Sequence, residues 1–181
     1  WADWMLTTDK RQRIRLAMAG LAALLMVCCL VAMNAVAAAG LANAVHVRVW
    51  TVCSVLGLIV VYAAIRSGWS RRFKDPSLTL AQILYSIACC AVAFVIAGPA
   101  RGVTLPILAI ILMFGIFGLT TRQMLGILLY GLVVFGVASG VVALRDEPGY
   151  PPVVAAAYVG MVVVVLLSST FLTTRVQSTR E

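Results

Sequence analysis

The chain has 181 residues, of which 63% are hydrophobic and only 11% are charged, and its mean hydropathy is +1.06. Soluble domains carry roughly a quarter charged residues, and a chain this short cannot bury so much hydrocarbon in one core. The composition excludes an ordinary soluble globular protein and predicts that much of the apolar surface faces lipid.

The net charge of +8 is interpreted as membrane-surface charge rather than as a nucleic-acid-binding feature. The basic residues cluster beside hydrophobic runs, where they meet anionic headgroups, and all six acidic residues fall in polar segments. We therefore expect membrane lipids as partners and no nucleic acid.

Six hydrophobic stretches follow one another along the chain, at 14–39, 47–65, 78–97, 103–119, 124–144 and 153–173. An α-helix of about 20 residues crosses a hydrocarbon core of about 30 Å, and stretches of this size match that requirement. The sequence predicts an all-α, polytopic membrane protein with six transmembrane helices, so that both termini lie on one side.

The connecting segments predict which side this is, because short cytoplasmic loops are enriched in Lys and Arg. One side of the predicted bundle holds eleven basic residues: Lys10, Arg11, Arg13, Arg15, Arg66, Arg71, Arg72, Lys74, Arg122, Arg175 and Arg180. The other side holds three, which are Arg48, Arg101 and Arg145. Both termini are predicted to be cytoplasmic.

The longest inner loop, 66–77, has the composition of a segment that lies on the membrane surface. Its aromatic residues can enter the headgroup layer while its basic residues bind phosphates. We predict a membrane-surface and coupling role for Trp69, Arg71, Arg72 and Lys74.

Motifs for catalysis are absent from the sequence. It contains no phosphate-binding glycine loop, nucleophile elbow, zinc-protease helix or paired carboxylates with a histidine, so no catalytic residue, metal ligand or cofactor is assigned. The predicted spans also lack Asp, Glu, Lys, Arg and His at their centres, where pumps and carriers place such residues. A channel or transporter for small neutral or lipophilic solutes and a purely structural anchor remain as alternatives.

Two places could bind a ligand. On the outer side, the polar residues of mixed charge are His46, Arg48, Trp50, Arg101, Asp146 and Glu147, together with Arg145 and Tyr150. Their alternative interpretation is ordinary loop solvation with interfacial aromatic anchoring. Within the spans, Tyr, Ser, Thr and Asn side chains predict hydrogen bonds between helices or, alternatively, a pocket for a small hydrophobic ligand.

Two further patterns within the spans predict packing. The five cysteines, Cys28, Cys29, Cys53, Cys89 and Cys90, have neither a zinc spacing nor a disulfide framework, so they are interpreted as small apolar packing residues, with a soft-metal or redox role as the alternative. Gly136 and Gly140 have the spacing that lets two helices approach closely, and packing within the chain is favoured over a dimer face.

Four segments resemble one bacterial family. They are 11–20 (RQRIRLAMAG), the inner loop 65–79 (IRSGWSRRFKDPSLT), the outer turn 97–102 (AGPARG) and the stretch 105–117. The chain resembles, from about Lys10 to Arg175, the six-helix membrane-associated sensor region found ahead of GGDEF domains in diguanylate cyclases.

The resemblance implies a sensory and dimerisation module in the bacterial inner membrane. It implies a cytoplasmic segment at 1–13, a six-helix sensor domain at 14–174, and at 175–181 the start of a helical linker to an output domain that makes cyclic di-GMP. No GGDEF motif occurs in this chain, so no catalytic residue is carried over. Similar modules precede adenylate cyclases and histidine kinases, which remain alternative outputs, and a homodimer is expected.

Overall fold

The structure is a computed structural model that describes residues 10–69, 78–145 and 150–178, and the regular secondary structure in these ranges is helical. The helices are α2 (Lys10–Ala38), α3 (Ala44–Arg66), α4 (Thr79–Ile96), α5 (Thr104–Gly118), α6 (Thr121–Leu144) and α7 (Pro152–Ser178), and the 3-10 helix η2 (Gly98–Val103) joins α4 to α5. The prediction of an all-α fold with six helices is confirmed.

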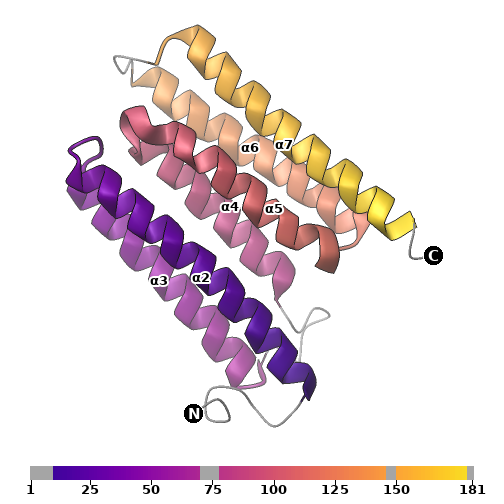
Figure 1. Ribbon diagram of the computed structural model, residues 1–181. Coiled ribbons are helices and arrows are strands. Elements are labelled where there is room, and N and C mark those ends of the chain that lie inside the picture. Colours follow the sequence, from indigo (N-terminus) through magenta and orange to yellow (C-terminus); the bar gives the residue numbers. More distant parts are fainter. Residues whose placement is uncertain (1–9, 70–77, 146–149, 179–181) are drawn as a thin grey trace.

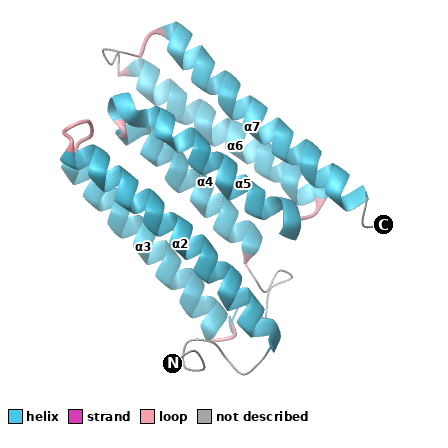
Figure 2. Ribbon diagram, viewed as in Figure 1, coloured by secondary structure: helices cyan, strands magenta, loops and turns pink. Residues whose placement is uncertain are grey.

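Consecutive helices run antiparallel and form three hairpins that lie side by side: α2 with α3, α4 with α5, and α6 with α7 (Figure 1). Short loops connect them where they are described (Figure 2). The turn after α2, η2 and the start of α7 gather at one end of the bundle, which we call the η2 end. The start of α2 and the end of α7 lie at the opposite end, as an even number of antiparallel helices requires.

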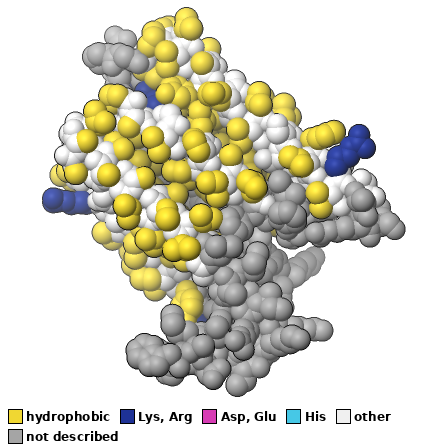
Figure 3. Space-filling view, in the orientation of Figure 1, with side chains coloured by type: hydrophobic (Ala, Val, Ile, Leu, Met, Phe, Trp, Pro, Cys, Tyr) yellow, Lys and Arg dark blue, Asp and Glu magenta, His cyan; other side chains and the backbone are white. Residues whose placement is uncertain are grey.

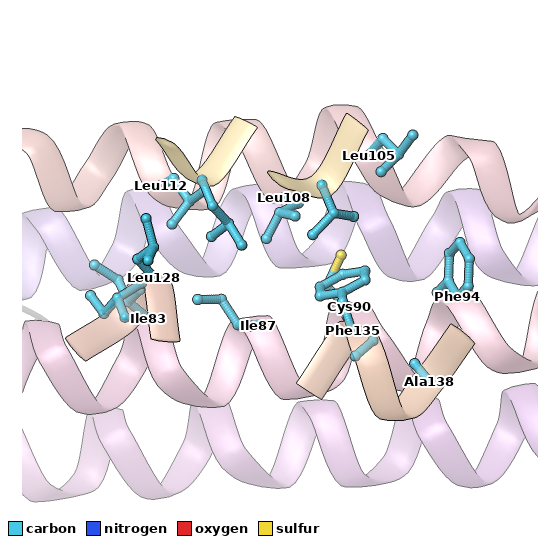
Figure 4. Packing of buried hydrophobic residues seen from close by; sticks show 14 of the residues in the cluster. Ile83, Ile87, Cys90, Phe94, Leu105, Leu108, Leu112, Leu128, Phe135 and Ala138 are labelled. Atoms are coloured by element: carbon cyan, nitrogen blue, oxygen red, sulfur yellow. The ribbon is translucent and has the colours of Figure 1, made fainter. Parts of the chain in front are cut away.

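The second and third hairpins pack into one four-helix unit with its own core. Helix α4 contacts α5 and α6, and α7 contacts the same two helices from the other side. Figure 4 shows side chains of α4, α5 and α6 meeting in this core, including Ile87, Leu108 and Phe135. These side chains are almost fully buried, so dispersion contacts hold the unit together.

The first hairpin packs on this unit chiefly through the contact of α3 with α4. A separate core lies between them, built from Met26, Leu30 and Met33 of α2, Val47 and Trp50 of α3, and Cys89, Ala93 and Ala97 at the α4 side. Helix α4 therefore contributes to two cores with two different faces.

Local sequence signals account for several helix ends. Thr120 and Gln123 form a capping box at the start of α6, because each side chain bonds the other residue's backbone N–H. Asn43 caps α3 by accepting from the N–H groups of Val45 and His46. Gly98, the first residue of η2, adopts a left-handed φ of 55°.

By helix length and hydropathy, this is a multi-pass membrane protein. Among the described residues, four helical segments are long and apolar enough to cross a bilayer: Ala44–Arg66, Thr79–Ile96, Thr121–Leu144 and Pro152–Val176. Shorter apolar segments occupy Ala22–Ala38 and Gly98–Met113. Figure 3 shows hydrophobic side chains over the middle of the visible face and Lys or Arg side chains toward its edges, as lipid contact requires.

Candidate functional site

The most unusual side chain of the fold is a buried arginine at the η2 end. Arg101 lies in η2 and is only 3% exposed. Its guanidinium carbon lies 4.5 Å from the centre of the Tyr150 ring and 5.7 Å from that of Phe94. Cation–π attraction of this kind contributes about 2 kcal/mol when the cation is desolvated.

Two rings, those of Phe94 and Tyr150, contact this arginine, and they pack in turn against the rings of Phe135 and Tyr158. The Phe94 ring makes edge-to-face contacts with Phe135, Tyr150 and Tyr158 at centroid distances of 6.0, 6.4 and 5.6 Å. Tyr150 and Tyr158 stack on each other with an interplanar angle of 14°. We call Phe94, Arg101, Phe135, Tyr150 and Tyr158 the Arg101 cluster. The Arg101 cluster joins four elements: α4 contributes Phe94, η2 contributes Arg101, α6 contributes Phe135 and α7 contributes Tyr158 in its second turn. Tyr150 lies just before the start of α7.

The local backbone explains how η2 reaches these rings. Thr104 donates from its hydroxyl to the Arg101 carbonyl over 2.7 Å and thereby stabilises the short 3-10 turn. A Cβ atom at Gly102 would lie 3.1 Å from the Tyr158 hydroxyl oxygen, so only glycine lets η2 approach α7 without displacing that tyrosine. The glycine thus lets η2, which carries Arg101, lie close to Tyr158 of α7.

The chemistry of the Arg101 cluster suits binding and anchoring. Its only charged member is the Arg101 guanidinium, a hydrogen-bond donor without acceptor atoms, and its hydroxyl groups belong to Tyr150 and Tyr158. The buried Tyr150 hydroxyl has no hydrogen-bond partner among the residues that the structure describes.

The predicted outer-side residues do not form one site among the described residues. His46 and Arg48 are exposed in the first turns of α3, whereas Trp50 is buried in the core between α2, α3 and α4. Arg101 and Tyr150 are the two predicted outer-side residues that the structure brings together, in the Arg101 cluster. Asp146 and Glu147 lie outside the described residues.

The predicted surface segment is described only at its start. Trp69 is 52% exposed just after α3, as a headgroup-contacting residue would be. Arg71, Arg72 and Lys74 lie outside the described residues, so their role stays a prediction.

A second polar arrangement, missed as a set by the sequence reasoning, joins α3 to α4. The Trp50 indole N–H donates to the Cys89 carbonyl over 2.9 Å, and the Tyr85 hydroxyl donates to the Cys53 carbonyl over 2.6 Å. Ser54 Oγ also lies 3.7 Å from Cys89 Sγ. We call Trp50, Ser54, Tyr85 and Cys89 the α3–α4 clasp.

The prediction of hydrogen bonds between helices is confirmed for part of the polar residues within the spans. Asn34 of α2 donates to the Thr51 hydroxyl of α3 over 3.1 Å, and Ser54 and Tyr85 act in the clasp. Ser169 and Thr170 of α7 bond instead to carbonyls of their own helix. The hydroxyls of Ser169 and Thr170 therefore have hydrogen-bond acceptors without a partner helix.

Two of the predicted packing cysteines are buried in different cores. Cys89 lies in the core shared with the first hairpin, and Cys90 lies in the four-helix unit, 3.3 Å from the Thr104 carbonyl oxygen. Cys28 and Cys53 are exposed, and Cys29 is half-buried. Within the described ranges, no group of three or more His, Cys, Asp or Glu side chains is placed to hold a metal ion.

The small-residue pair of α6 points away from the rest of the chain. Gly136 and Gly140 are exposed, and a Cβ atom at either would meet no atom within 4 Å. The expectation that they pack against another helix of the same chain is wrong. Gly131, on a different face of α6, makes that close approach instead, because a Cβ there would lie 3.0 Å from Leu166 Cδ2.

Comparison with known proteins gives no assignment. The chain matches no family model, and no curated protein or solved structure is significantly similar to it.

Proposed function

We propose that this chain is a membrane sensory and dimerisation module that regulates a diguanylate cyclase domain located beyond α7. The observation that carries the proposal is the path of α7. This single helix starts at Pro152, between two tyrosines of the Arg101 cluster, and runs without a break to Ser178 at the opposite end of the bundle (Figure 1). A change at the η2 end would therefore move the end that leads to an output domain.

The packing of α7 supports movement along or about its own axis. Its hydroxyl side chains Ser169, Thr170, Thr173 and Thr174 each donate to a carbonyl of α7 itself, at 2.8 to 3.0 Å. Apolar contacts with α5 and α6 hold the helix in place. A shift of α7 therefore breaks none of these hydrogen bonds.

The last turns of α7 suit an exit from the membrane. The Arg175 guanidinium carbon lies 5.3 Å from the centre of the Phe171 ring, and the arginine is exposed. A basic residue at this point binds lipid phosphates while the helix continues into water. Val176 to Ser178 extend the helix without Gly or Pro.

In the proposed arrangement all six helices cross the bacterial inner membrane, and both termini are cytoplasmic. The eleven-to-three distribution of Lys and Arg supports this orientation. A homodimer is part of the proposal, because cyclic di-GMP synthesis joins two nucleotides held by two catalytic domains. The uncovered face of α6 at Gly136 and Gly140 supports it, since small residues let helices of two copies approach closely.

The proposal can be tested by fusing the chain, through α7, to a GGDEF catalytic domain that lacks its own input region. Insertions of about one to seven residues after Ser178 rotate the domain by about 100° for each residue. Cyclic di-GMP, measured in a strain without other diguanylate cyclases, is expected to rise and fall with the helical period. The same insertions in the isolated catalytic domain serve as the control.

Output that does not depend on insertion length would contradict the proposed coupling through α7. Solute flux through proteoliposomes containing the purified chain would instead support the transporter. A coding sequence that continues into an adenylate cyclase or a histidine kinase would keep the sensory role and replace the output.

A further inference from the structure

The hairpin of α2 and α3 differs from the other two hairpins in the way it is attached. We propose that this hairpin is a movable unit, held on α4 by the α3–α4 clasp, and that opening of the clasp is a conformational switch of the bundle. The inference concerns the membrane bundle alone, so it can fail or succeed independently of the proposed output.

The hydrophobic interior of the bundle is divided into two cores. Cys89, Ala93 and Ala97 belong to the core shared with the first hairpin, whereas Ile87 and Cys90 belong to the four-helix unit. Moving α3 away from α4 therefore opens the first core and leaves the second intact. The four-helix unit keeps all its helix pairs during such a movement.

The hydrogen bonds of the clasp can open at little cost. Its two strongest hydrogen bonds are reciprocal, because Trp50 of α3 donates to the α4 backbone and Tyr85 of α4 donates to the α3 backbone. Both acceptors are helix carbonyls within an α-helix, where the N–H four residues later already bonds each of them. Opening therefore leaves two donors without partners and no unpaired carbonyl. Because only two hydrogen bonds are lost, the contact between α3 and α4 can open and close reversibly.

The close contact of Tyr85 with Gly57 fixes the register of α4 against α3 in the clasp. A Cβ atom at Gly57 would overlap the Tyr85 ring, so the ring lies directly across the backbone of α3. The Tyr85 hydroxyl then reaches the Cys53 carbonyl, one turn earlier in α3. A side chain larger than hydrogen at position 57 must push the hydroxyl away from this carbonyl.

A backbone contact at the η2 end, between Gly98 and Leu41, can act as a pivot. Gly98 has a φ of 55°, and a Cβ atom there would lie 2.6 Å from the carbonyl oxygen of Leu41 in the turn after α2. The connection between α2 and α3 thus touches the connection between α4 and α5. The hairpin can swing about this contact while the clasp opens.

The two adjacent cysteines of α4 provide a matched pair of probes. Cys89 is 8% exposed and belongs to the clasp, whereas Cys90 is 4% exposed and lies in the other core. Two proteins are made in which four of the five cysteines are Ala, one retaining Cys89 and the other Cys90. The rate of labelling by a membrane-permeant maleimide is then measured in lipid vesicles.

Tyr85→Phe and Trp50→Phe each remove one clasp hydrogen bond and are expected to raise the Cys89 labelling rate about threefold, the average effect of one hydrogen bond between membrane helices. The Cys90 rate is expected to stay unchanged. Tyr130→Phe, which removes a hydroxyl from α6, is the control and is expected to change neither rate.

Unchanged Cys89 labelling in both variants would overturn the proposal. Equal increases at Cys89 and Cys90 would also overturn it, because they would indicate general loosening of the fold. Gly57→Ala supplies a test that leaves both donors in place, and it is expected to raise the Cys89 rate selectively.

Discussion

At the scale of single residues, Arg101 shows how a charged group is accommodated inside a membrane protein. Its flat guanidinium is covered by the rings of Tyr150 and Phe94, and it lies at the η2 end of the bundle rather than in its centre. A planar cation stacks on an aromatic ring, whereas an ammonium group acts as a strongly hydrated point charge. The geometry therefore requires arginine and not only a positive charge.

We expect Arg101→Lys to lower the free energy of unfolding by about 1–2 kcal/mol, because the stacking on Tyr150 is lost while the charge stays buried. Reversible unfolding of the purified protein in detergent or bicelles measures this change. Arg145→Lys is the matched control, since Arg145 is exposed at the end of α6. Equal effects of the two substitutions would argue against a specific role for the Arg101 cluster.

The glycines allow a second prediction. Gly57→Ala is expected to lower the free energy of unfolding by about 1 kcal/mol, because it displaces the Tyr85 hydroxyl from the Cys53 carbonyl. Gly20→Ala in α2 is the control in open space, and it is expected to be neutral or to stabilise α2 by about 0.5 kcal/mol through helix propensity. A loss of stability in Gly20→Ala as large as that in Gly57→Ala would show that the effect at position 57 does not come from the contact with Tyr85.

At the scale of the elements, α7 differs from α3. Helix α3 contacts α4 through side-chain donors that reach the neighbouring backbone, whereas Ser and Thr hydroxyls of α7 bond within their own helix. Hydrogen bonds between helices in a membrane contribute about 0.6 kcal/mol on average and restrict register. These hydroxyls of α7 therefore do not oppose the rotation or shift that the proposed role in signal transmission requires.

The proposed homodimer predicts that two copies of α7 continue side by side beyond the membrane. Single cysteines introduced along 176–181, in a background without the five native cysteines, are expected to crosslink between subunits. The crosslinking yield should vary with a period of about 3.5 residues, as in a parallel helix pair. Crosslinking in native membranes, followed by mass measurement of the product, tests this prediction. A monomer in membranes and in detergent, without crosslinks at any of the positions, would contradict it.

At the scale of the whole molecule, the position of the termini follows from the antiparallel order of six helices. The start of α2 and the end of α7 lie at the same end of the bundle (Figure 1). The distribution of Lys and Arg predicts that this end is cytoplasmic. Reporter fusions at Trp1 and Glu181 are expected to show cytoplasmic activity for both, and a periplasmic signal from either fusion would contradict the predicted topology.

The sequence by itself determined the helices of this protein. Backbone groups in lipid must bond within their own segment, so each long apolar run has to be helical, and polar or Gly-Pro segments have to lie between the runs. The predicted spans 47–65, 78–97 and 124–144 accordingly agree within a few residues with α3, α4 and α6. The capping box at Thr120 and Gln123 sharpens one of these boundaries.

Only the tertiary structure decided which side chains meet. In a soluble helix the buried face lies opposite the polar face, so the sequence pattern identifies it. A helix in lipid is apolar all round, and its hydrophobic pattern does not show which face packs against the other helices. The outer-side prediction placed Trp50 with Arg101, whereas the structure buries Trp50 against Cys89 and places Arg101 against Phe94 and Tyr150. Phe94 gave no signal in the sequence, because a phenylalanine in an apolar run can equally face lipid or a neighbouring helix. Packing between helices, and not hydrophobicity, makes that choice.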